Sequence, residues 1–377
     1  MRIALLTRRF DPHGGGTERD AIISAECLRA AGHEVTFYAR EVRGNSHELT
    51  VREVGGMQLG RTASLLTFAY GAPAAARRDG ADLVLSFARS IGADVMRSGG
   101  SAHISYLRAA QQWRGTAGAL AMRASPYHRA QVFIERRGFM SPRLRKAIAV
   151  SKLVRDDLMR EFRLPDEKIV ILYNGVDLKR FTPADDDSAR REIRSSLGLH
   201  DGAPMVAFVG NGFARKGLTF LLAAWPQVAR GAHLLVVGSD QKLGWYRREA
   251  RRLGVEARVH FVGARTEVVP IFRAVDAVAL PSLFEPFGNV ILEAMACGAP
   301  VLSSMQSGAA ELLPESMQCF VVRDPTDTEE LASRMNALLE TSAELRGLAR
   351  ATTERYTWSA YGENLNAILS AMIGAAG

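Results

Sequence analysis

The stretch at residues 277–304 constrains the fold of this chain more than any other part of its sequence. It begins and ends with short apolar runs of the kind that buried parallel strands show. Between these runs, Glu285 precedes a proline and is biased away from the helical region. Residues 290–297 then form a compact apolar helix that a glycine and a proline end. The stretch therefore predicts strand, turn, helix and strand, with Glu285 in the turn and Glu293 inside the helix.

The start of the expected helix is a candidate site for an anion. Phe287, Gly288 and Asn289 lead into it, its first backbone amides have no partner within the helix, and a glycine lets a ligand approach the chain closely. The carboxylates of Glu285 and Glu293 would repel a phosphate, but they accept hydrogen bonds from hydroxyl groups. A molecule with phosphates and several hydroxyls, such as a sugar nucleotide, satisfies the whole stretch.

The two glutamates allow two other interpretations. The acid/base pair of a glycosidase needs carboxylates about 5 to 9 Å apart. Eight residues of continuous helix would separate the two Cα atoms by about 12 Å, which disfavours a hydrolase. Alternatively, Glu285 is an ordinary loop acid and Glu293 is an acid favoured by the helix dipole. Spacing alone leaves this last interpretation open.

The same stretch resembles the E-x7-E signature of retaining glycosyltransferases of family 4. Phe-Gly follows Glu285 after a proline, and Ala-Met-Ala-Cys-Gly-Ala-Pro-Val follows Glu293. The flanking strand and the Gly-x-Pro-Val ending accompany the two glutamates here, and together they make the motif specific.

Length and composition indicate two globular domains. The 377 residues suit two units of about 180 each. With 47% hydrophobic and 23% charged residues, and no run near the roughly 18 apolar residues of a membrane span, a soluble protein is expected. The N-terminal segment is better explained as a first strand than as a signal peptide. Three scattered cysteines without metal spacing suggest reduced thiols in the cytoplasm.

The formal charge of +8 and the pI of about 9.7 favour an anionic partner. Residues 104–146 hold nine Lys or Arg and a single acid, Glu135, which accounts for the whole excess. Aromatic residues interleave with these cations, a pattern that suits an anionic membrane surface, where each cation contributes about 1 kcal/mol. A solvated helix face explains the pattern equally well. No RNA-binding or zinc-finger consensus is present, so we expect no nucleic acid partner.

The first half begins with a strand, a glycine loop, a helix and a second strand, as in doubly wound folds. Thr17 is expected to cap the helix. A dinucleotide fingerprint would need glycine where Arg19 stands, which argues against nicotinamide, but a loop with Gly15 and Gly16 still suits an anion or a sugar. Further on, His103 follows two glycines at the end of a strand region, where it is either a ligand contact or a structural histidine.

The second half restarts this pattern after a turn-rich acidic segment, and the best domain boundary lies there. The expected domains are residues 1–180 and 181–356, with a final helix at about 357–377 that crosses back to the first domain. A strand at 205–209 leads into a loop with Gly210, Arg215 and Lys216. These cations, at a strand end beside a helix start, would meet a diphosphate, unless they are a pair on a solvated loop.

Three further segments complete the second half. Arg265 follows a strand at 258–263 and could meet a base edge. An apolar run at 318–322 predicts a last strand. Helices are expected at about 327–340 and 343–356.

We therefore predict an α/β protein with two doubly wound, Rossmann-like domains that face each other across a cleft. Over essentially its whole length the chain is similar to glycosyltransferases of the GT-B type. Three segments more closely resemble the lipopolysaccharide core glucosyltransferases that add glucose to inner-core heptose: residues 10–20, the basic segment after Gly99 and Gly100, and residues 210–217.

The resemblance implies a role for each matching residue. Arg215 and Lys216 would hold the diphosphate, and Glu293 the ribose hydroxyls. Glu285 and the backbone that follows would meet the sugar and distal phosphate, Gly15 and Gly16 would close over the donor, and His103 would meet the transferred sugar. Gly100 stands where relatives carry an acid, so no general base is assigned there, and Asp20 is the candidate base. The implied donor-binding set is Gly15, Gly16, Gly210, Arg265, Phe287, Gly288, Asn289, Val290 and Glu293.

The expected activity is transfer of a hexose with retained configuration, with UDP-glucose as the donor. The expected acceptor is a glycolipid or a saccharide, in particular the inner-core heptose of lipopolysaccharide. The cations and the helix start would stabilise the leaving group without metal or cofactor, and no Asp-x-Asp motif is found at a cleft position. The enzyme would be cytoplasmic, on the inner face of the inner membrane. The alternatives are a non-catalytic nucleotide-sugar or membrane-binding protein, a phosphorylase, for which a lysine set for pyridoxal is missing, or a transferase for another envelope glycan.

Overall fold

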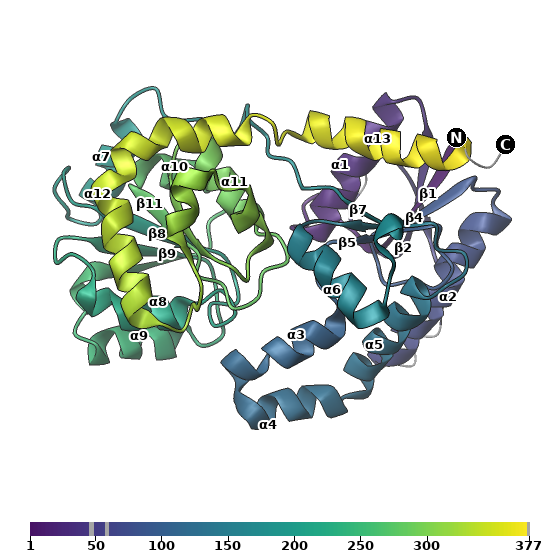
Figure 1. The fold of residues 1–377 in the computed structure, drawn as a ribbon, viewed down its shortest axis with the longest axis horizontal. Coiled ribbons are helices and arrows are strands. Elements are labelled where there is room, and N and C mark those ends of the chain that lie inside the picture. The colour runs from purple at the N-terminus through teal and green to yellow at the C-terminus, as the bar shows by residue number, and fades with distance from the viewer. Residues whose placement is uncertain (45–48, 57–59, 375–377) are drawn as a thin grey trace. The chain divides into compact units, whose positions relative to one another are not determined.

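The computed structural model describes residues 1–44, 49–56 and 60–374, and the chain divides into two compact units (Figure 1). Unit 1 comprises Met1–Asn174 together with Trp358–Gly377, and unit 2 comprises Gly175–Thr357. The C-terminal helix therefore packs with the N-terminal half of the chain.

Unit 1 is built on a parallel sheet that has seven strands among the described residues, in the order β3-β2-β1-β4-β5-β6-β7. Strand β4 is fully buried and β6 is buried apart from Lys146, as short apolar runs in a parallel sheet should be. The strands are β1 Arg2–Phe10, β2 Glu34–Val42, β3 Thr50–Glu53, β4 Leu83–Ser86, β5 Val95–Ser98, β6 Lys146–Ala149 and β7 Ile169–Ile171.

The helices of unit 1 show one difference from the sequence prediction. Thr17 was expected to cap the first helix, but the N-cap is Gly16, at φ 58°, and Thr17 is the first helical residue. Glycine takes this backbone conformation without the steric penalty that a side chain would bring. The helices are α1 Thr17–Ala30, α2 Gly60–Arg78, α3 His103–Ala109, α4 Gln111–Ala124, α5 Pro126–Phe139, α6 Lys152–Phe162 and α13 Trp358–Gly374.

A buried polar network ties α13 into unit 1. The Arg97 side chain in β5 is fully buried, and it donates hydrogen bonds to Asp20 at 2.9 Å and to Asn174 at 2.6 Å. The Tyr361 hydroxyl of α13 also contacts this guanidinium and lies 2.9 Å from Ser24 Oγ on α1. A buried charge is tolerated only with such partners, so the network specifies where α13 packs. Figure 1 shows α13 alongside α1.

Unit 2 repeats this architecture with a six-stranded parallel sheet in its described residues, in the order β10-β9-β8-β11-β12-β13. Counted from its own first strand, this is the doubly wound order 3-2-1-4-5-6, which the first six strands of unit 1 also follow. The strands are β8 Met205–Val209, β9 His233–Val237, β10 Val259–Gly263, β11 Ala277–Ala279, β12 Val301–Ser304 and β13 Val321–Val322. The prediction of two doubly wound α/β domains is confirmed.

The C-terminal part of unit 2 corrects two expectations. The helices expected at 327–340 and 343–356 are one helix, Thr328–Thr353, because Thr341 and Ser342 bond their hydroxyls to preceding carbonyls and so do not end it. The strand expected at 318–322 is mostly 3₁₀ helix, with two strand residues. The helices are α7 Ser188–Ser196, α8 Leu218–Ala224, α9 Leu243–Arg252, α10 Val269–Ala274, α11 Asn289–Ala296 and α12 Thr328–Thr353.

In both sheets the strand order reverses beside the first strand, between β1 and β4 and between β8 and β11. Open α/β sheets bind ligands in the crevice at the carboxyl ends of the strands on either side of such a reversal. None of the helices in the described part of the chain is long and apolar enough to cross a bilayer.

The buried network yields a stability prediction. Tyr361→Phe removes a hydroxyl that partners both Ser24 and Arg97, so we expect the free energy of unfolding to fall by about 1–2 kcal/mol in urea denaturation. The matched control is Tyr70→Phe, because Tyr70 is 48% exposed, and it should change stability little. Equal stability of the two variants would contradict the role given to the network.

Candidate active site

The clearest charged cluster of unit 2 joins two loops on either side of the strand-order reversal. Glu285, after β11, accepts hydrogen bonds on a single carboxylate oxygen from Lys216 at 2.6 Å and from Arg215 at 3.1 Å, both from the loop after β8. Arg215 also donates to the carbonyl of Phe284 at 2.6 Å. Glu285 lies in the loop and Glu293 in helix α11, as predicted, but the ion pairing between the two motifs was not predicted.

The backbone holds Glu285 in place from a third loop. Its N–H donates to the carbonyl of Gln306, and its own carbonyl accepts from the N–H of Gly308, both at 2.9 Å. Burial disfavours ionisation of Glu285, but the charges of Lys216 and Arg215 outweigh it and keep the pKa of the carboxyl below its ordinary value. Two cations therefore share one anion, and the fixed cluster retains positive charge toward a ligand.

Glycines allow these two loops to approach each other. Gly210 has φ 143°, and a Cβ there would lie 2.6 Å from Cε of Lys216. Gly217, at φ 85° before α8, would place a Cβ only 1.9 Å from the carbonyl oxygen of Pro281. Gly217 therefore lets the two loops pack closely, and Gly210 leaves room for the Lys216 side chain that reaches Glu285.

The start of α11 lies beside this cluster. Gly288 is its N-cap at φ 99°, and helix α11 begins at Asn289, one residue earlier than predicted. The Phe287 carbonyl accepts hydrogen bonds from Ser307 Oγ at 3.0 Å and from the Ala309 N–H at 2.7 Å, which fixes the entry to the helix. Val290 and Glu293 are half-buried.

Three other candidate donor residues are exposed. Arg265 lies in the segment after β10 in unit 2, whereas Gly15 and Gly16 lie in the loop between β1 and α1 in unit 1. A Cβ at either glycine would meet no atom within 4 Å, so this loop has open space next to its backbone. The roles assigned to these residues stay predictions.

His103 is the first residue of α3 and is buried. Its Nε2 lies 2.9 Å from Nδ1 of His128, and its ring stacks on those of His128 and Tyr106. Burial, with the nearby charges of Arg89 and His128, lowers the pKa of His103 to about 3. His103 is thus neutral near pH 7, and a contact with a sugar would be a neutral hydrogen bond.

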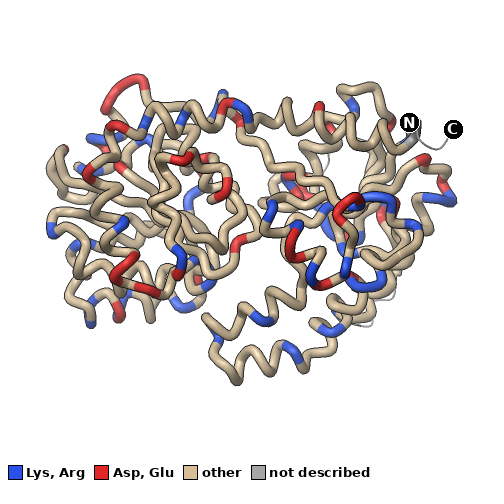
Figure 2. The backbone as a smooth tube through the Cα atoms, viewed as in Figure 1, with Lys and Arg blue, Asp and Glu red and all other residues tan. Residues whose placement is uncertain are grey.

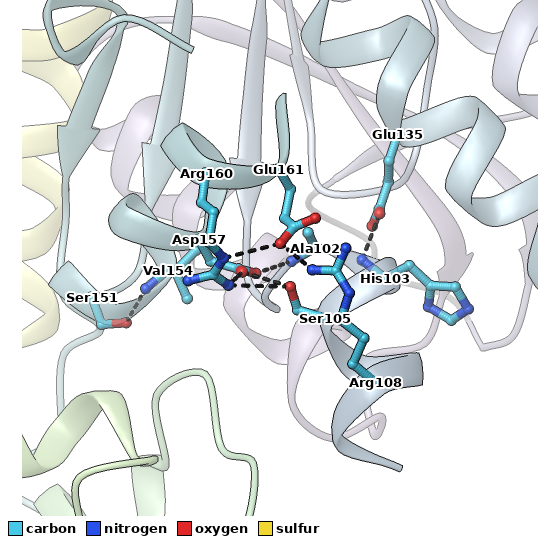
Figure 3. Close-up of polar contacts among 10 residues, drawn as sticks. All are labelled: Ala102, His103, Ser105, Arg108, Glu135, Ser151, Val154, Asp157, Arg160 and Glu161. Carbon is cyan, nitrogen blue, oxygen red and sulfur yellow. Dashed lines mark hydrogen bonds and ion pairs between the residues drawn. The ribbon is translucent and has the colours of Figure 1, made fainter. Parts of the chain in front are cut away.

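Two carboxylates from other helices occupy the N-terminal end of α3, as Figure 3 shows. The Ala102 N–H donates to Asp157 at 2.7 Å and the His103 N–H donates to Glu135 at 2.6 Å, while Ser105 Oγ donates to Asp157 at 2.6 Å. Burial raises the pKa of both carboxyls. Sequence reasoning missed this arrangement, because the contacts join α3 to α5 and α6, and no local signal marks them.

Asp20, the candidate base, is a member of the buried network around Arg97. Its carboxylate balances a guanidinium that would otherwise be buried without a counter-ion. This gives Asp20 a structural role, and its catalytic role stays a prediction.

Unit 1 contains a cavity of about 350 Å³ at the carboxyl ends of β1, β4 and β5. This is the strand-order reversal of unit 1, so the cavity lies where such sheets bind ligands. Sequence reasoning missed most of its polar lining, although two arginines at the end of the first strand were the available signal. The polar side chains of the lining include Arg8, Arg9, Glu18, Arg89, Tyr127 and Gln131.

Among the described residues, no group of three or more His, Cys, Asp or Glu side chains converges as metal ligands do. The cationic side chains at the candidate site are those of Arg215 and Lys216.

Both halves of the chain match glycosyltransferase families. Residues 14–180 match the family described as Glycosyltransferase Family 4, and residues 203–341 match Glycosyl transferases group 1. The lipopolysaccharide glucosyltransferase WaaG of Escherichia coli K12 is 26% identical over 338 residues, which cover 88% of this chain and 87% of that protein. An uncharacterized glycosyltransferase of Methanocaldococcus jannaschii is 31% identical over 172 residues, 45% of this chain and 44% of that protein. The chain spans about half the length of the first curated relatives it matches, from 44% to 51%.

Solved structures share the fold. A crystal structure of WaaG has a TM-score of 0.79 at 23% identity and covers 97% of this chain and 99% of its own. The structure of HepE from Anabaena in complex with UDP-glucose has a TM-score of 0.72 at 20% identity, covering 98% and 100%. The fold of this chain is therefore of the GT-B type.

The glycine packing in unit 2 yields a second prediction. Gly210→Ala forces a side chain into positive φ and against Lys216, so the Lys216 side chain must shift from its present position against Glu285. We expect the variant to lose about 1–3 kcal/mol of stability in thermal or urea unfolding. Gly231→Ala is the control, because a Cβ at that exposed glycine meets nothing within 4 Å. Comparable stability of both variants would contradict the packing argument.

Proposed function

Because this chain belongs to the glycosyltransferases of GT-B fold, we propose that it transfers a hexose from a nucleoside diphosphate sugar with retained configuration and without a metal. UDP-glucose is the proposed donor, and HepE, a protein of the same fold, has been crystallised with it. The proposed acceptor is a glycolipid or saccharide, and inner-core heptose of lipopolysaccharide fits the similarity to WaaG. The observation that carries the proposal is the pair of cations held by Glu285 beside the start of α11.

In the proposed reaction, the acceptor hydroxyl oxygen bonds to the anomeric carbon as the bond from that carbon to the phosphate oxygen breaks. Negative charge grows on the leaving diphosphate, where Arg215 and Lys216 are already fixed and need no reorganisation. Removing one such fixed donor typically lowers kcat by about 10²–10³. The leaving phosphate takes the acceptor proton. Glu285, whose pKa is lowered, positions the cations, while Glu293 binds the ribose hydroxyls.

A second proposal concerns the place of the enzyme in the cell. Helices α4 and α5 and the residue after them expose apolar side chains, with Leu120 65%, Phe133 48% and Met140 58% accessible. Exposed arginines lie among them, and Figure 2 shows basic and no acidic positions along α4. This combination supports peripheral binding to an anionic membrane on the cytoplasmic face of the inner membrane.

Donor binding tests the first proposal. We expect UDP-glucose at about 100 times its dissociation constant to stabilise the folded protein by about 2.7 kcal/mol, seen as a higher Tm. Arg215→Ala and Glu293→Ala should lose this shift. Arg247→Ala, which removes an exposed arginine of unit 2, should keep it.

Three outcomes would contradict the proposal. The first is that no nucleoside diphosphate sugar shifts the Tm, which would favour a non-catalytic protein on this scaffold. The second is that the Tm shift with UDP-glucose persists in Arg215→Ala. The third is that a chelator abolishes turnover, which would overturn the metal-free mechanism.

Vesicle binding tests the second proposal. Arg123, Arg129 and Arg136 are exposed, and changing all three to Gln should weaken binding to phosphatidylglycerol vesicles by roughly two orders of magnitude, at about 1 kcal/mol each. The matched control changes three exposed cations of unit 2 to Gln: Lys242, Arg247 and Arg248. Equal vesicle co-sedimentation of the two triple variants would exclude α4 and α5 as the membrane contact.

A further inference from the structure

Unit 1 has a second hollow next to the cavity at its strand-order reversal. It has a volume of about 790 Å³ and shares four lining residues with the first cavity: Arg8, Arg9, Glu18 and Tyr127. The two hollows therefore adjoin around these four side chains. All of their lining belongs to unit 1, so the hollows do not depend on unit 2.

Six arginines and four glutamates line the two hollows, and most of these arginines are already engaged. Arg97 pairs with Asp20, Arg89 with Glu135 at 2.6 Å and Arg9 with Glu41 at 3.3 Å. Arg40 donates to two backbone carbonyls and a serine hydroxyl. All four guanidiniums make contacts within the fold, although Nε and Nη1 of Arg97 are buried without a hydrogen-bond partner among the described residues.

Arg8 and Arg61 differ from the other four. Arg8 donates from Nη1 to the hydroxyl of Tyr127 at 3.1 Å, and the Arg61 guanidinium lies 4.6 Å from the centre of the same ring. Within the described residues, no carboxylate lies in ion-pair distance of either. Two guanidiniums thus converge on one phenol with no carboxylate of the described residues in ion-pair distance, an arrangement that suits an anionic ligand.

We infer that the acceptor carries an anionic group, a phosphate or a carboxylate, which binds Arg8 and Arg61 beside the Tyr127 hydroxyl. The inference rests on the proposed function, because it assigns this site to the acceptor. A guanidinium presents parallel N–H donors that match two oxygens of a phosphate or carboxylate, and the phenol adds a further donor. Glu18, which also lines both hollows, accepts hydrogen bonds from the hydroxyls of the attached sugar.

The position in the fold assigns this anion to the acceptor and not to the donor. Arg8 belongs to β1 and lines the cavity at the strand-order reversal of unit 1, and Arg61 lies in the first turn of α2. The cations proposed for the donor diphosphate, Arg215 and Lys216, belong to unit 2. Each unit therefore has its own anion site, and the two sites can be tested separately.

The test is calorimetric titration of the whole chain, first saturated with UDP, with inorganic phosphate and, in a second arm, with acetate. UDP occupies the proposed donor site, so it removes phosphate binding at Arg215 and Lys216 from the signal. We expect one of the two anions to bind wild type, and the tighter one identifies the acceptor group as phosphate or carboxylate. Binding should weaken about tenfold or more in Arg8→Gln and in Arg61→Gln. Arg61 is exposed, so its replacement leaves the core intact.

The matched control is Arg78→Gln, which removes an exposed arginine from the last turn of the same helix and should bind the anion as wild type does. Arg61→Lys should retain part of the affinity for the anion, because lysine keeps the positive charge but lacks the parallel N–H donors of the guanidinium. The inference is overturned if neither anion binds, or if Arg61→Gln and Arg78→Gln bind equally.

The design also separates this inference from the donor proposal. The Tm shift with UDP-glucose should persist in Arg8→Gln and Arg61→Gln. If UDP binds no form of the protein, the donor proposal fails, and the anion site is then measured in Arg215→Ala without UDP. Loss of anion binding in Arg61→Gln on that background would still support the site in unit 1.

Discussion

The candidate sites of this protein depend on one geometric constraint: in a parallel sheet, all strands deliver their carboxyl ends to the same edge. In unit 2 this brings the loop after β8, with Arg215, to the loop after β11, with Glu285. In unit 1 it brings Arg8 at the end of β1 near the segments that follow β4 and β5. The reversal of strand order beside the first strand of each sheet keeps a crevice open between these loops.

A carboxylate paired with cationic side chains stabilises the fold in unit 1 and prepares a site for an anion in unit 2. The burial of the pair decides which of these it does. Arg97 and Asp20 lie fully inside unit 1, where each neutralises the other and together they position α13. Glu285 instead faces two cations in a partly exposed loop, so positive charge is left over for an anion. A carboxylate that orders cations before a ligand arrives lowers the reorganisation that binding would otherwise require.

The helix starts at α11 and α3 have different environments. Helix α11 begins at a glycine N-cap beside Lys216 and Arg215, in a setting that suits an anionic ligand. The amides at the start of α3 instead donate to Asp157 and Glu135, so an anion would meet two carboxylates there. The N-terminus of each helix carries the same partial positive charge. The neighbouring side chains therefore decide whether it can bind an anionic ligand or is already occupied by carboxylates of the protein.

Local patterns in the sequence were sufficient to predict the fold class and to place Glu285 in a loop and Glu293 in a helix. The spacing of apolar residues, and glycine and proline, determine the backbone conformation within a few residues. They failed where the deciding contact is distant. Thr341 and Ser342 resemble a helix break until their hydroxyls bond within α12, and Asp20 resembles a free acid until Arg97 reaches it from 77 residues away. The ion pairs of Glu285 and the meeting of Arg8 and Arg61 at Tyr127 join segments that only the order of strands in the sheets brings together.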